Sequence, residues 1–142
     1  MWRVFCYTYL MFKEPSKELE AFSVVRRLKS FKHAFRGIAV LVRTQHNMWV
    51  HITAMVVAIA FGFWLRISTV QWALIVFSIG FVVVAEGFNT ALEFDIDLTS
   101  PEEHPFARDT KDVAAAAVLL AAITAVIVGL LVFVPKFLIV LR

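Results

Sequence analysis

Three long stretches without a charged side chain constrain the fold of this chain more than any other feature. They cover 44–65, 67–85 and 113–135, and each is at least 19 residues long. About 20 apolar residues in a helix cross the hydrocarbon core of a bilayer, where every backbone amide needs a partner within the protein. Strands would alternate polar and apolar residues, and these stretches do not. The sequence therefore predicts an all-α membrane protein with three transmembrane helices.

The composition excludes the main alternatives. Of 142 residues, 61% are hydrophobic and 18% are charged, which is too apolar for a soluble domain of this length. The single cysteine, Cys6, excludes a disulfide framework and a cysteine zinc site. His46 and His51 are five residues apart, on different sides of a helix, so interfacial anchors are favoured over a metal pair.

The charged residues at the edges of the stretches set the expected topology. We place the spans at about 47–65, 69–92 and 112–135, so the first two form a tight hairpin and 93–112 joins the last two. Ser100-Pro101-Glu102-Glu103 fits a capping box, which predicts a short surface helix in that connection. Residues 1–43 carry nine Lys or Arg against three Glu, which places the amino terminus and the 93–112 connection in the cytoplasm.

Residues 19–43 have apolar side chains at helical spacing, interleaved with Lys and Arg. This pattern predicts an amphipathic helix on the membrane surface, and attraction to anionic lipid headgroups explains its charge better than nucleic acid does. Residues 1–18 are expected to be a disordered or loosely attached extension before a single membrane domain at 19–142. The short apolar start is followed by Lys13-Glu14-Pro15 rather than a cleavage site, so we do not interpret it as a signal peptide.

Four polar residues at the end of the second stretch are the strongest functional signal. Glu86, Asn89, Glu93 and Asp97 lie within about 80° of one another if the helix continues past the apolar stretch. A carboxylate at the depth of Glu86 costs several kcal/mol unless it faces protein, water or a cation. A structural polar contact between helices would explain one such residue. Repeated carboxylates on one face repel one another, which points to a visiting cation.

The 93–112 connection is also acidic, with only Arg108 and Lys111 as basic residues. An ordinary solvated loop would explain this, but so would magnesium carrying a nucleotide, since the ion prefers oxygen ligands and is often held by one or two carboxylates plus phosphates. Lys111 opens the third span, where a cation and the helix amino terminus together favour phosphate. The small residues Ala114–Ala117 then allow another helix to approach closely.

These residues resemble the small prokaryotic diacylglycerol kinases, membrane lipid kinases that include undecaprenol kinases. The similarity covers roughly residues 25–135, and its matching blocks are Ser30–Gly37, Asn47–His51, Glu86-x-x-Asn89-Thr90-Ala91-Leu92-Glu93 with Asp97, and Lys111–Val118. The resemblance implies a homotrimer of three-span subunits in the bacterial inner membrane. It also implies active sites near the cytoplasmic face, shared between neighbouring subunits.

The resemblance also implies roles for individual residues. Glu86 resembles the catalytic base that takes the proton of the lipid hydroxyl, and Glu93 resembles a magnesium ligand. Asn89 resembles a residue that shapes the site, and Lys111 resembles the phosphate-binding lysine. Three further positions resemble nucleotide contacts: Arg26, Asp97 and Asp112.

One position departs from the family pattern. Where members commonly have a second metal-binding Glu before the first span, this chain has Gln45. A Gln carbonyl can bind magnesium, but it lacks the charge that holds a divalent ion. We keep Gln45 as a candidate metal position and expect either one tightly bound magnesium or help from another acid.

The expected function is an ATP-dependent lipid kinase that phosphorylates diacylglycerol to phosphatidic acid, with Mg²⁺ as cofactor. The first alternative is an undecaprenol kinase of the same family. A small oligomeric proton-coupled transporter would also use a membrane carboxylate such as Glu86, but it leaves Asn89, Glu93 and Lys111 without a task. A non-catalytic assembly protein is the remaining possibility.

Overall fold

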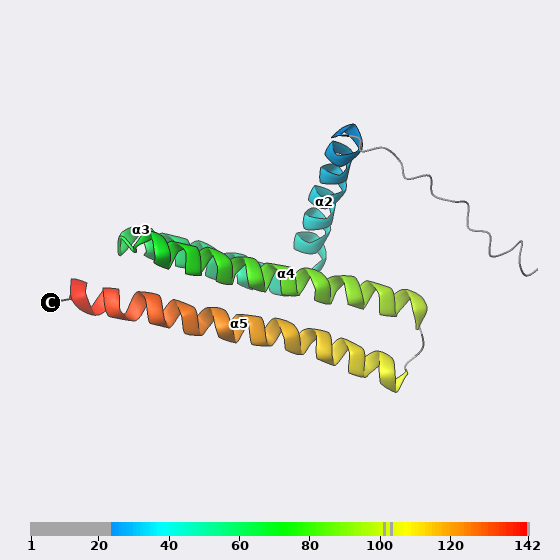
Figure 1. The fold of residues 1–142 in the computed structure, drawn as a ribbon. Helices are drawn as coiled ribbons and strands as arrows, with labels where there is room; N and C mark the ends of the chain where they lie inside the picture. Colours follow the sequence, from blue (N-terminus) through cyan, green and yellow to red (C-terminus); the bar gives the residue numbers. More distant parts are fainter. Residues whose placement is uncertain (1–23, 101, 103, 142) are drawn as a thin grey trace, which may run out of the picture. The chain divides into compact units, whose positions relative to one another are not determined.

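The computed structural model describes residues 24–100, 102 and 104–141, and the side chains from residue 28 onward. This part of the chain is helical, without strands, and consists of α2 (Val24–Thr44), α3 (His46–Trp64), α4 (Thr69–Thr99) and α5 (Pro105–Val140) (Figure 1). The predicted all-α fold is confirmed for these residues. The expected extension 1–18 lies outside them.

The chain divides into two units, Met1–Phe35 and Arg36–Arg142, and α2 passes from one into the other. The helix predicted at 19–43 is present as α2 from residue 24 onward, and residues 19–23 lie outside the described part. Arg43 in its last turn complements the negative end of the helix dipole. Whether α2 rests on a membrane surface stays a prediction.

Three helices, α3, α4 and α5, are long and apolar enough to cross a membrane, as predicted. Two of the helices are longer than the spans predicted within them, because α4 has 31 residues and α5 has 36. At 1.5 Å per residue they are about 46 Å and 54 Å long, against about 30 Å for a hydrocarbon core. Charged residues end the apolar stretch but not the helix. Glu93, Arg108 and Lys111 are good helix formers, and the aspartates between them cost only roughly a few tenths of a kcal/mol each.

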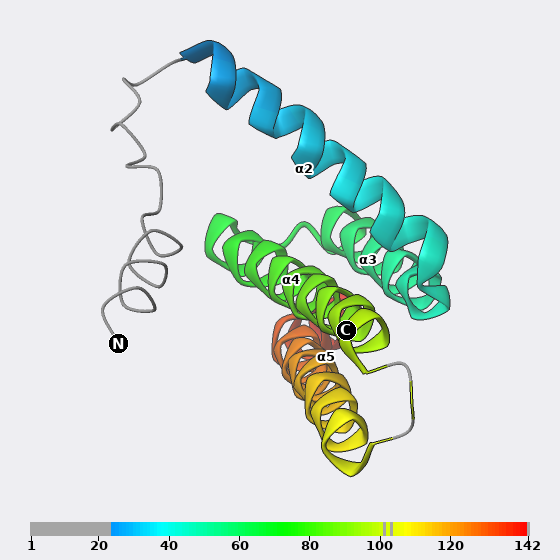
Figure 2. The ribbon, with the colours of Figure 1, turned by 90° about the vertical axis from the view of Figure 1, so that its right-hand side faces the viewer.

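The connection between α4 and α5 is consequently only Ser100–His104 (Figure 2). The short surface helix predicted there is wrong. Ser100 ends α4, its amide donating to the carbonyl of Ile96, and Pro105 opens α5 with the His104 Nδ1 accepting from the Phe106 amide at 3.3 Å. Pro105 is therefore the first residue of α5. The first N–H groups of a helix have no partner within the helix, so the missing N–H of proline breaks no hydrogen bond there.

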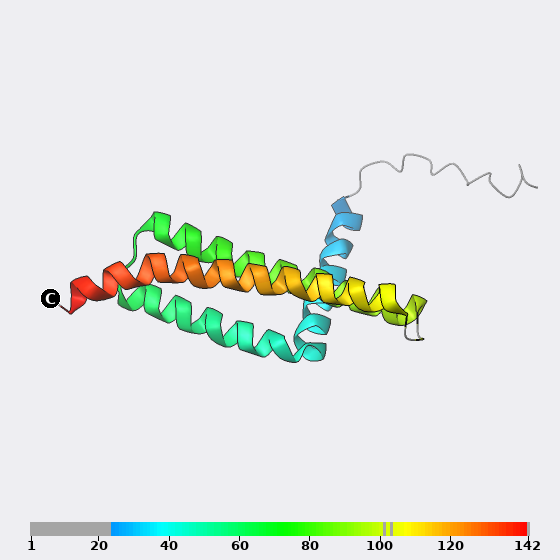
Figure 3. The ribbon, with the colours of Figure 1, turned by 90° about the horizontal axis from the view of Figure 1, so that it is seen from below.

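The helices α4 and α5 lie side by side along most of their length, and α3 packs against both (Figure 3). The predicted hairpin of α3 and α4 turns at Leu65–Ser68. There Arg66 has a positive φ of 49°, and Ser68 and Gln71 form a capping box at the start of α4. This turn lies at the opposite end of α4 from the polar residues.

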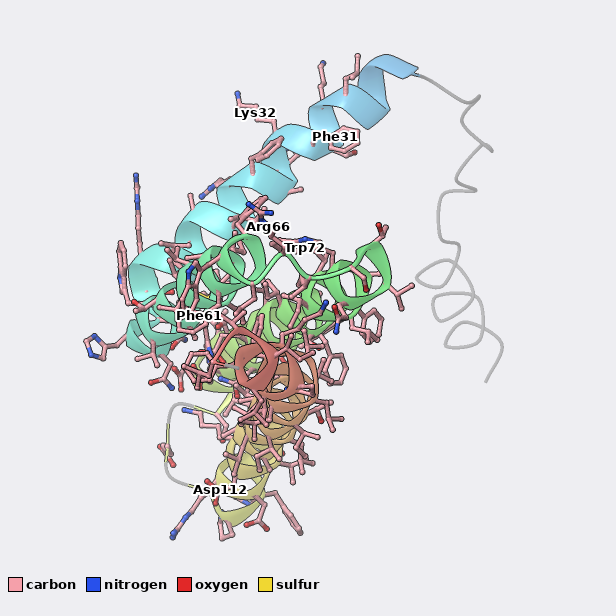
Figure 4. The ribbon with its side chains drawn as sticks, turned by 90° about the vertical axis from the view of Figure 1, so that its left-hand side faces the viewer. Phe31, Lys32, Phe61, Arg66, Trp72 and Asp112 are labelled. Atoms are coloured by element: carbon pink, nitrogen blue, oxygen red, sulfur yellow. The ribbon has the colours of Figure 1, made fainter. Side chains whose placement is uncertain are left out.

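An apolar cluster holds the turn end of the bundle together. Leu65, Ile67, Ile75 and Val132 form its buried centre, and the Trp72 ring packs against it. Gly62 lets the ring approach, because a Cβ there would lie 2.7 Å from Trp72 Cη2. Figure 4 labels Trp72 and Arg66 at this turn.

Candidate active site

The polar residues of α4 share one face of the helix, because α4 continues without a break to Thr99. Their exposure rises along this face. Glu86 is 1% exposed and Asn89 7%, Glu93 is half-buried, and the side chain of Asp97 is 63% exposed. The face therefore leads from the interior of the apolar bundle out to its surface.

Glu86 is the most deeply buried large side chain in the described residues. Its Oε1 is buried and has no hydrogen-bond partner there, while Thr90 Oγ1 donates to the Glu86 backbone carbonyl at 2.8 Å. His51 and Glu93 are close enough to interact with this carboxyl group electrostatically. Leaving a buried acceptor unpaired costs about 1–3 kcal/mol, so Glu86 is poised to accept a proton or hydrogen bond from a bound molecule.

Glu93 is held by two amide groups, one for each carboxylate oxygen. Asn89 Nδ2 donates to Oε1 at 2.8 Å, and Gln45 Nε2 donates to Oε2 at 2.8 Å. Gln45 is the N-cap residue of α3, where the backbone is extended, so the start of α3 is tied to the last third of α4. The remaining oxygen of the Asn89 amide, Oδ1, is buried and has no partner in the described part of the chain.

Lys111 connects the exposed end of this face to α5. Its Nζ donates to Asp97 Oδ1 at 2.5 Å across the two helices. Arg108, about one turn before Lys111 on α5, forms a looser ion pair with Asp112, the residue after Lys111, at 3.9 Å. All four side chains are at least 40% exposed, so their charges are accessible to a ligand from solution.

A cavity of about 800 Å³ opens between the ends of α4 and α5, next to the Ser100–His104 connection. Its size is within the range of small-molecule and cofactor sites. It is lined by both basic and acidic side chains, with Asp112 labelled in Figure 4. The charged residues of the lining are Asp97, Glu102, Arg108, Asp109, Lys111 and Asp112.

A second, apolar groove of about 360 Å³ lies between α3, α4 and α5. Two of its lining residues, Val82 and Val83, lie within about one turn of Glu86 on α4. Its only polar side chains in the described residues are His51 and Ser78, and Ser78 is occupied by the Leu74 carbonyl. The groove therefore brings an apolar surface close to the Glu86 carboxyl.

Glu93 and the two amides beside it are the residues that could hold a magnesium ion. Carboxylate and amide oxygens are ligands that this ion accepts, but Gln45 and Asn89 face Glu93 with their NH2 groups, so their oxygens would have to turn toward the ion. The described residues contain no group of three His, Cys, Asp or Glu side chains that would hold a metal alone. Magnesium here would need further ligands from water or phosphate.

The structure brings the predicted site residues together in two neighbouring groups. Gln45, Glu86, Asn89 and Glu93 form the inner group, and Asp97, Lys111 and Asp112 line the outer cavity. The side chain of Arg26 is outside the described part, and its nucleotide contact stays a prediction.

Sequence reasoning missed His51, which it interpreted as an interfacial anchor. The structure places this side chain in the lining of the apolar groove, near enough to Glu86 to act on its charge. The sequence signal that could have identified His51 is its position inside a stretch without charged residues, where a polar side chain needs a reason. Arg108 was also missed as part of a ligand cavity.

Comparison with known proteins identifies relatives of this chain. A family model described as prokaryotic diacylglycerol kinase matches residues 32–133. An undecaprenol kinase from Bacillus subtilis is 39% identical over 124 residues, which is 87% of this chain and 97% of that enzyme. A diacylglycerol kinase from Synechocystis is 38% identical over 78% of this chain and 64% of its own length, and one from Escherichia coli is 34% identical over 52% and 61%.

These relatives support the lipid kinase over the transporter and the non-catalytic assembly protein. They are named kinases, and enzymes of this family transfer phosphate to the alcohol group of a lipid. A kinase family implies ATP as the phosphoryl donor, and three helices of the described chain are long and apolar enough to cross a membrane. The transporter alternative has no such support. The chain belongs to the prokaryotic diacylglycerol kinase family and is a lipid phosphotransferase.

Proposed function

We propose that this chain transfers the γ-phosphoryl group of ATP to the hydroxyl of a membrane lipid, with Glu86 as the catalytic base. The observation that carries this proposal is the buried Glu86 Oε1, which has no partner among the described residues and follows the apolar groove on a helix that leads to a charged cavity. A lipid acceptor comes from the hydrocarbon and a nucleotide from water. Glu86 is placed where the two would meet.

The proposed reaction uses the residues in the order of their burial. Glu86 Oε1 accepts the proton of the lipid hydroxyl as its oxygen forms a bond to the γ-phosphorus, and ADP leaves with the electrons of the broken bond. Lys111 and Arg108 neutralise phosphate oxygens in the outer cavity. Asn89 holds Glu93 in place through its amide.

Magnesium, when bound at Glu93, would neutralise the charge on the phosphate oxygens. The surrounding apolar side chains exclude water from Glu86, which favours transfer to the lipid over hydrolysis of ATP. Asp97 orients Lys111 through their ion pair, so the ammonium group is directed into the cavity. Arg26 and Asp112 complete the proposed nucleotide contacts.

The acceptor has two candidates. Diacylglycerol is the substrate expected from the sequence, and two of the relatives are named for it. Undecaprenol is favoured by a relative that is 39% identical along 97% of its length, whereas the diacylglycerol kinases match either over a smaller part of their length or at a lower identity. We therefore propose undecaprenol as the first candidate and diacylglycerol as the second.

The proposed setting is a homotrimer in the bacterial inner membrane, with the amino terminus and the active site on the cytoplasmic side. The excess of Lys and Arg before the first span supports this orientation. Exposed Leu28, Phe31, Phe35 and Ile38 support placing α2 on the membrane surface. Neighbouring subunits would then complete the sites on the open side of each bundle.

The experiment is a side-by-side transfer assay. The full chain in detergent–lipid micelles receives Mg²⁺ and γ-labelled ATP, with undecaprenol in one sample and diacylglycerol in the other. We expect labelled lipid in at least one sample and a larger yield with undecaprenol. A larger yield with diacylglycerol would reverse the choice of acceptor, and no label in either lipid would contradict the proposed function.

A further inference from the structure

We infer that Gln45 makes divalent-cation binding at Glu93 depend on bound nucleotide. This inference rests on the proposed function, because it concerns the same site. It starts from the two hydrogen bonds on Glu93, in which each carboxylate oxygen accepts from an amide at 2.8 Å. Both Glu93 oxygens are thus hydrogen-bonded to amide N–H groups, which stabilise the carboxylate but carry no net charge.

The chemistry of an amide fixes how Gln45 faces Glu93. If the amide were rotated by 180°, its carbonyl oxygen would lie at hydrogen-bond distance from a carboxylate oxygen, and two acceptors would repel each other. Only a cation between them would make that arrangement favourable. The Gln45 amide therefore donates when no cation is present, and it can present its oxygen when one arrives.

Charge then decides how tightly a cation is held. The group formed by Gln45, Asn89 and Glu93 carries one negative charge, and the described residues contain no cluster of three metal-binding side chains. Magnesium sites of this kind usually combine one or two carboxylates with substrate phosphates. A single carboxylate that already has two amide donors needs the triphosphate charge to attract the ion.

A carboxylate at position 45 would change this balance. It would place a second negative charge within hydrogen-bond distance of Glu93, and the pair would repel unless a cation lay between them. Gln45→Glu should therefore bind a divalent ion without nucleotide. Gln71→Glu is a matched control, since it adds the same charge at the far end of α4 and keeps the capping box with Ser68.

Equilibrium dialysis of the purified full-length chain against Mn²⁺ tests the inference, with and without a non-hydrolysable ATP analogue. We expect the wild type and Gln71→Glu to retain Mn²⁺ beyond the buffer level only with the analogue. Gln45→Glu should retain it without the analogue, with an affinity about tenfold or more above that of the wild type. Mn²⁺ should also raise the melting temperature of Gln45→Glu, but not of Gln71→Glu, because binding to the folded state stabilises it.

Three results would overturn the inference. The wild type could retain Mn²⁺ without nucleotide as well as Gln45→Glu does, Gln45→Glu could bind no better than Gln71→Glu, or the wild type could retain none with the analogue. None of these measurements requires phosphate transfer. Failure of the transfer assay is therefore distinguishable from failure of this inference.

Discussion

The two ends of the α4–α5 pair differ in whether their buried side chains find partners within the chain. At the turn end, Trp72 packs onto Gly62 and the apolar cluster within van der Waals distance. At the other end, Glu86 Oε1 and Asn89 Oδ1 are buried without partners among the described residues, and the same helix leads on to a charged cavity that begins at Ile96. The comparison indicates that the turn end supports the fold, whereas the polar end keeps two buried acceptors that the described residues do not satisfy.

Among the changes outside Glu86, the largest effect on this comparison is expected from removing the charge of Lys111. Lys111→Met keeps the length of the side chain but removes the ammonium group that lies in the cavity beside Asp97. A hydrogen bond to a charged group contributes about 1.5–3 kcal/mol, so we expect the KM for ATP to rise about 10- to 100-fold. Steady-state kinetics of the purified protein at varied ATP concentration measure this KM.

The control for this change lies on the same helix. Lys136→Met removes the same charge near the other end of α5, outside the cavity. It should leave the KM for ATP unchanged. An equal rise in both variants would remove Lys111 from nucleotide binding and weaken the contrast between the two ends.

A moderate effect is expected at the turn end, on stability rather than on catalysis. Gly62→Ala places a Cβ 2.7 Å from the Trp72 ring, and overpacking of this kind costs about 1–3 kcal/mol. We expect a lower unfolding temperature in detergent for Gly62→Ala. In Gly80→Ala the new Cβ has no neighbour within 4 Å, so that variant should unfold at or above the wild-type temperature. Similar losses in both variants would show that the Trp72 contact does not matter.

The smallest effect is expected at Arg66, which holds a left-handed backbone conformation at φ 49°. A residue with a Cβ is disfavoured there by about 1–2 kcal/mol relative to glycine, and glycine loses part of this advantage to its larger unfolded-state entropy. Arg66→Gly should therefore be more stable than Arg66→Ala by up to about 1 kcal/mol. Both variants lose the arginine charge, so the difference between their unfolding temperatures measures the backbone effect alone. Equal stability would mean that the turn carries no strain.

Sequence reasoning recovered the helices and the polar face, because charge-free stretches and a 100° periodicity are local signals. It placed the α4–α5 connection at 93–112 because it equated the end of the apolar stretch with the end of the helix. The structure continues both helices to Ser100–His104. Local patterns indicate where a helix leaves hydrocarbon, but helix-forming charged residues carry it further.

Contacts between distant residues were beyond the reach of local patterns. The hydrogen bond from Gln45 to Glu93 joins positions 48 residues apart, and the approach of His51 to Glu86 depends on how α3 packs against α4. The turn geometry of Arg66 was missed for a related reason, since arginine gives no signal for a positive φ. The packing of the helices determines these features.

The central claim is that Glu86 is the base for phosphate transfer, and the most direct test compares two carboxylates on α4. Glu86→Gln keeps the shape of the buried side chain but removes its ability to accept the proton. Asp95→Asn makes the same chemical change nine residues later, on the opposite, exposed side of the helix. We expect transfer of γ-phosphate from ATP to the lipid to fall about 100- to 10,000-fold in Glu86→Gln and to stay near the wild-type rate in Asp95→Asn. Undiminished transfer by a folded Glu86→Gln protein would contradict the account.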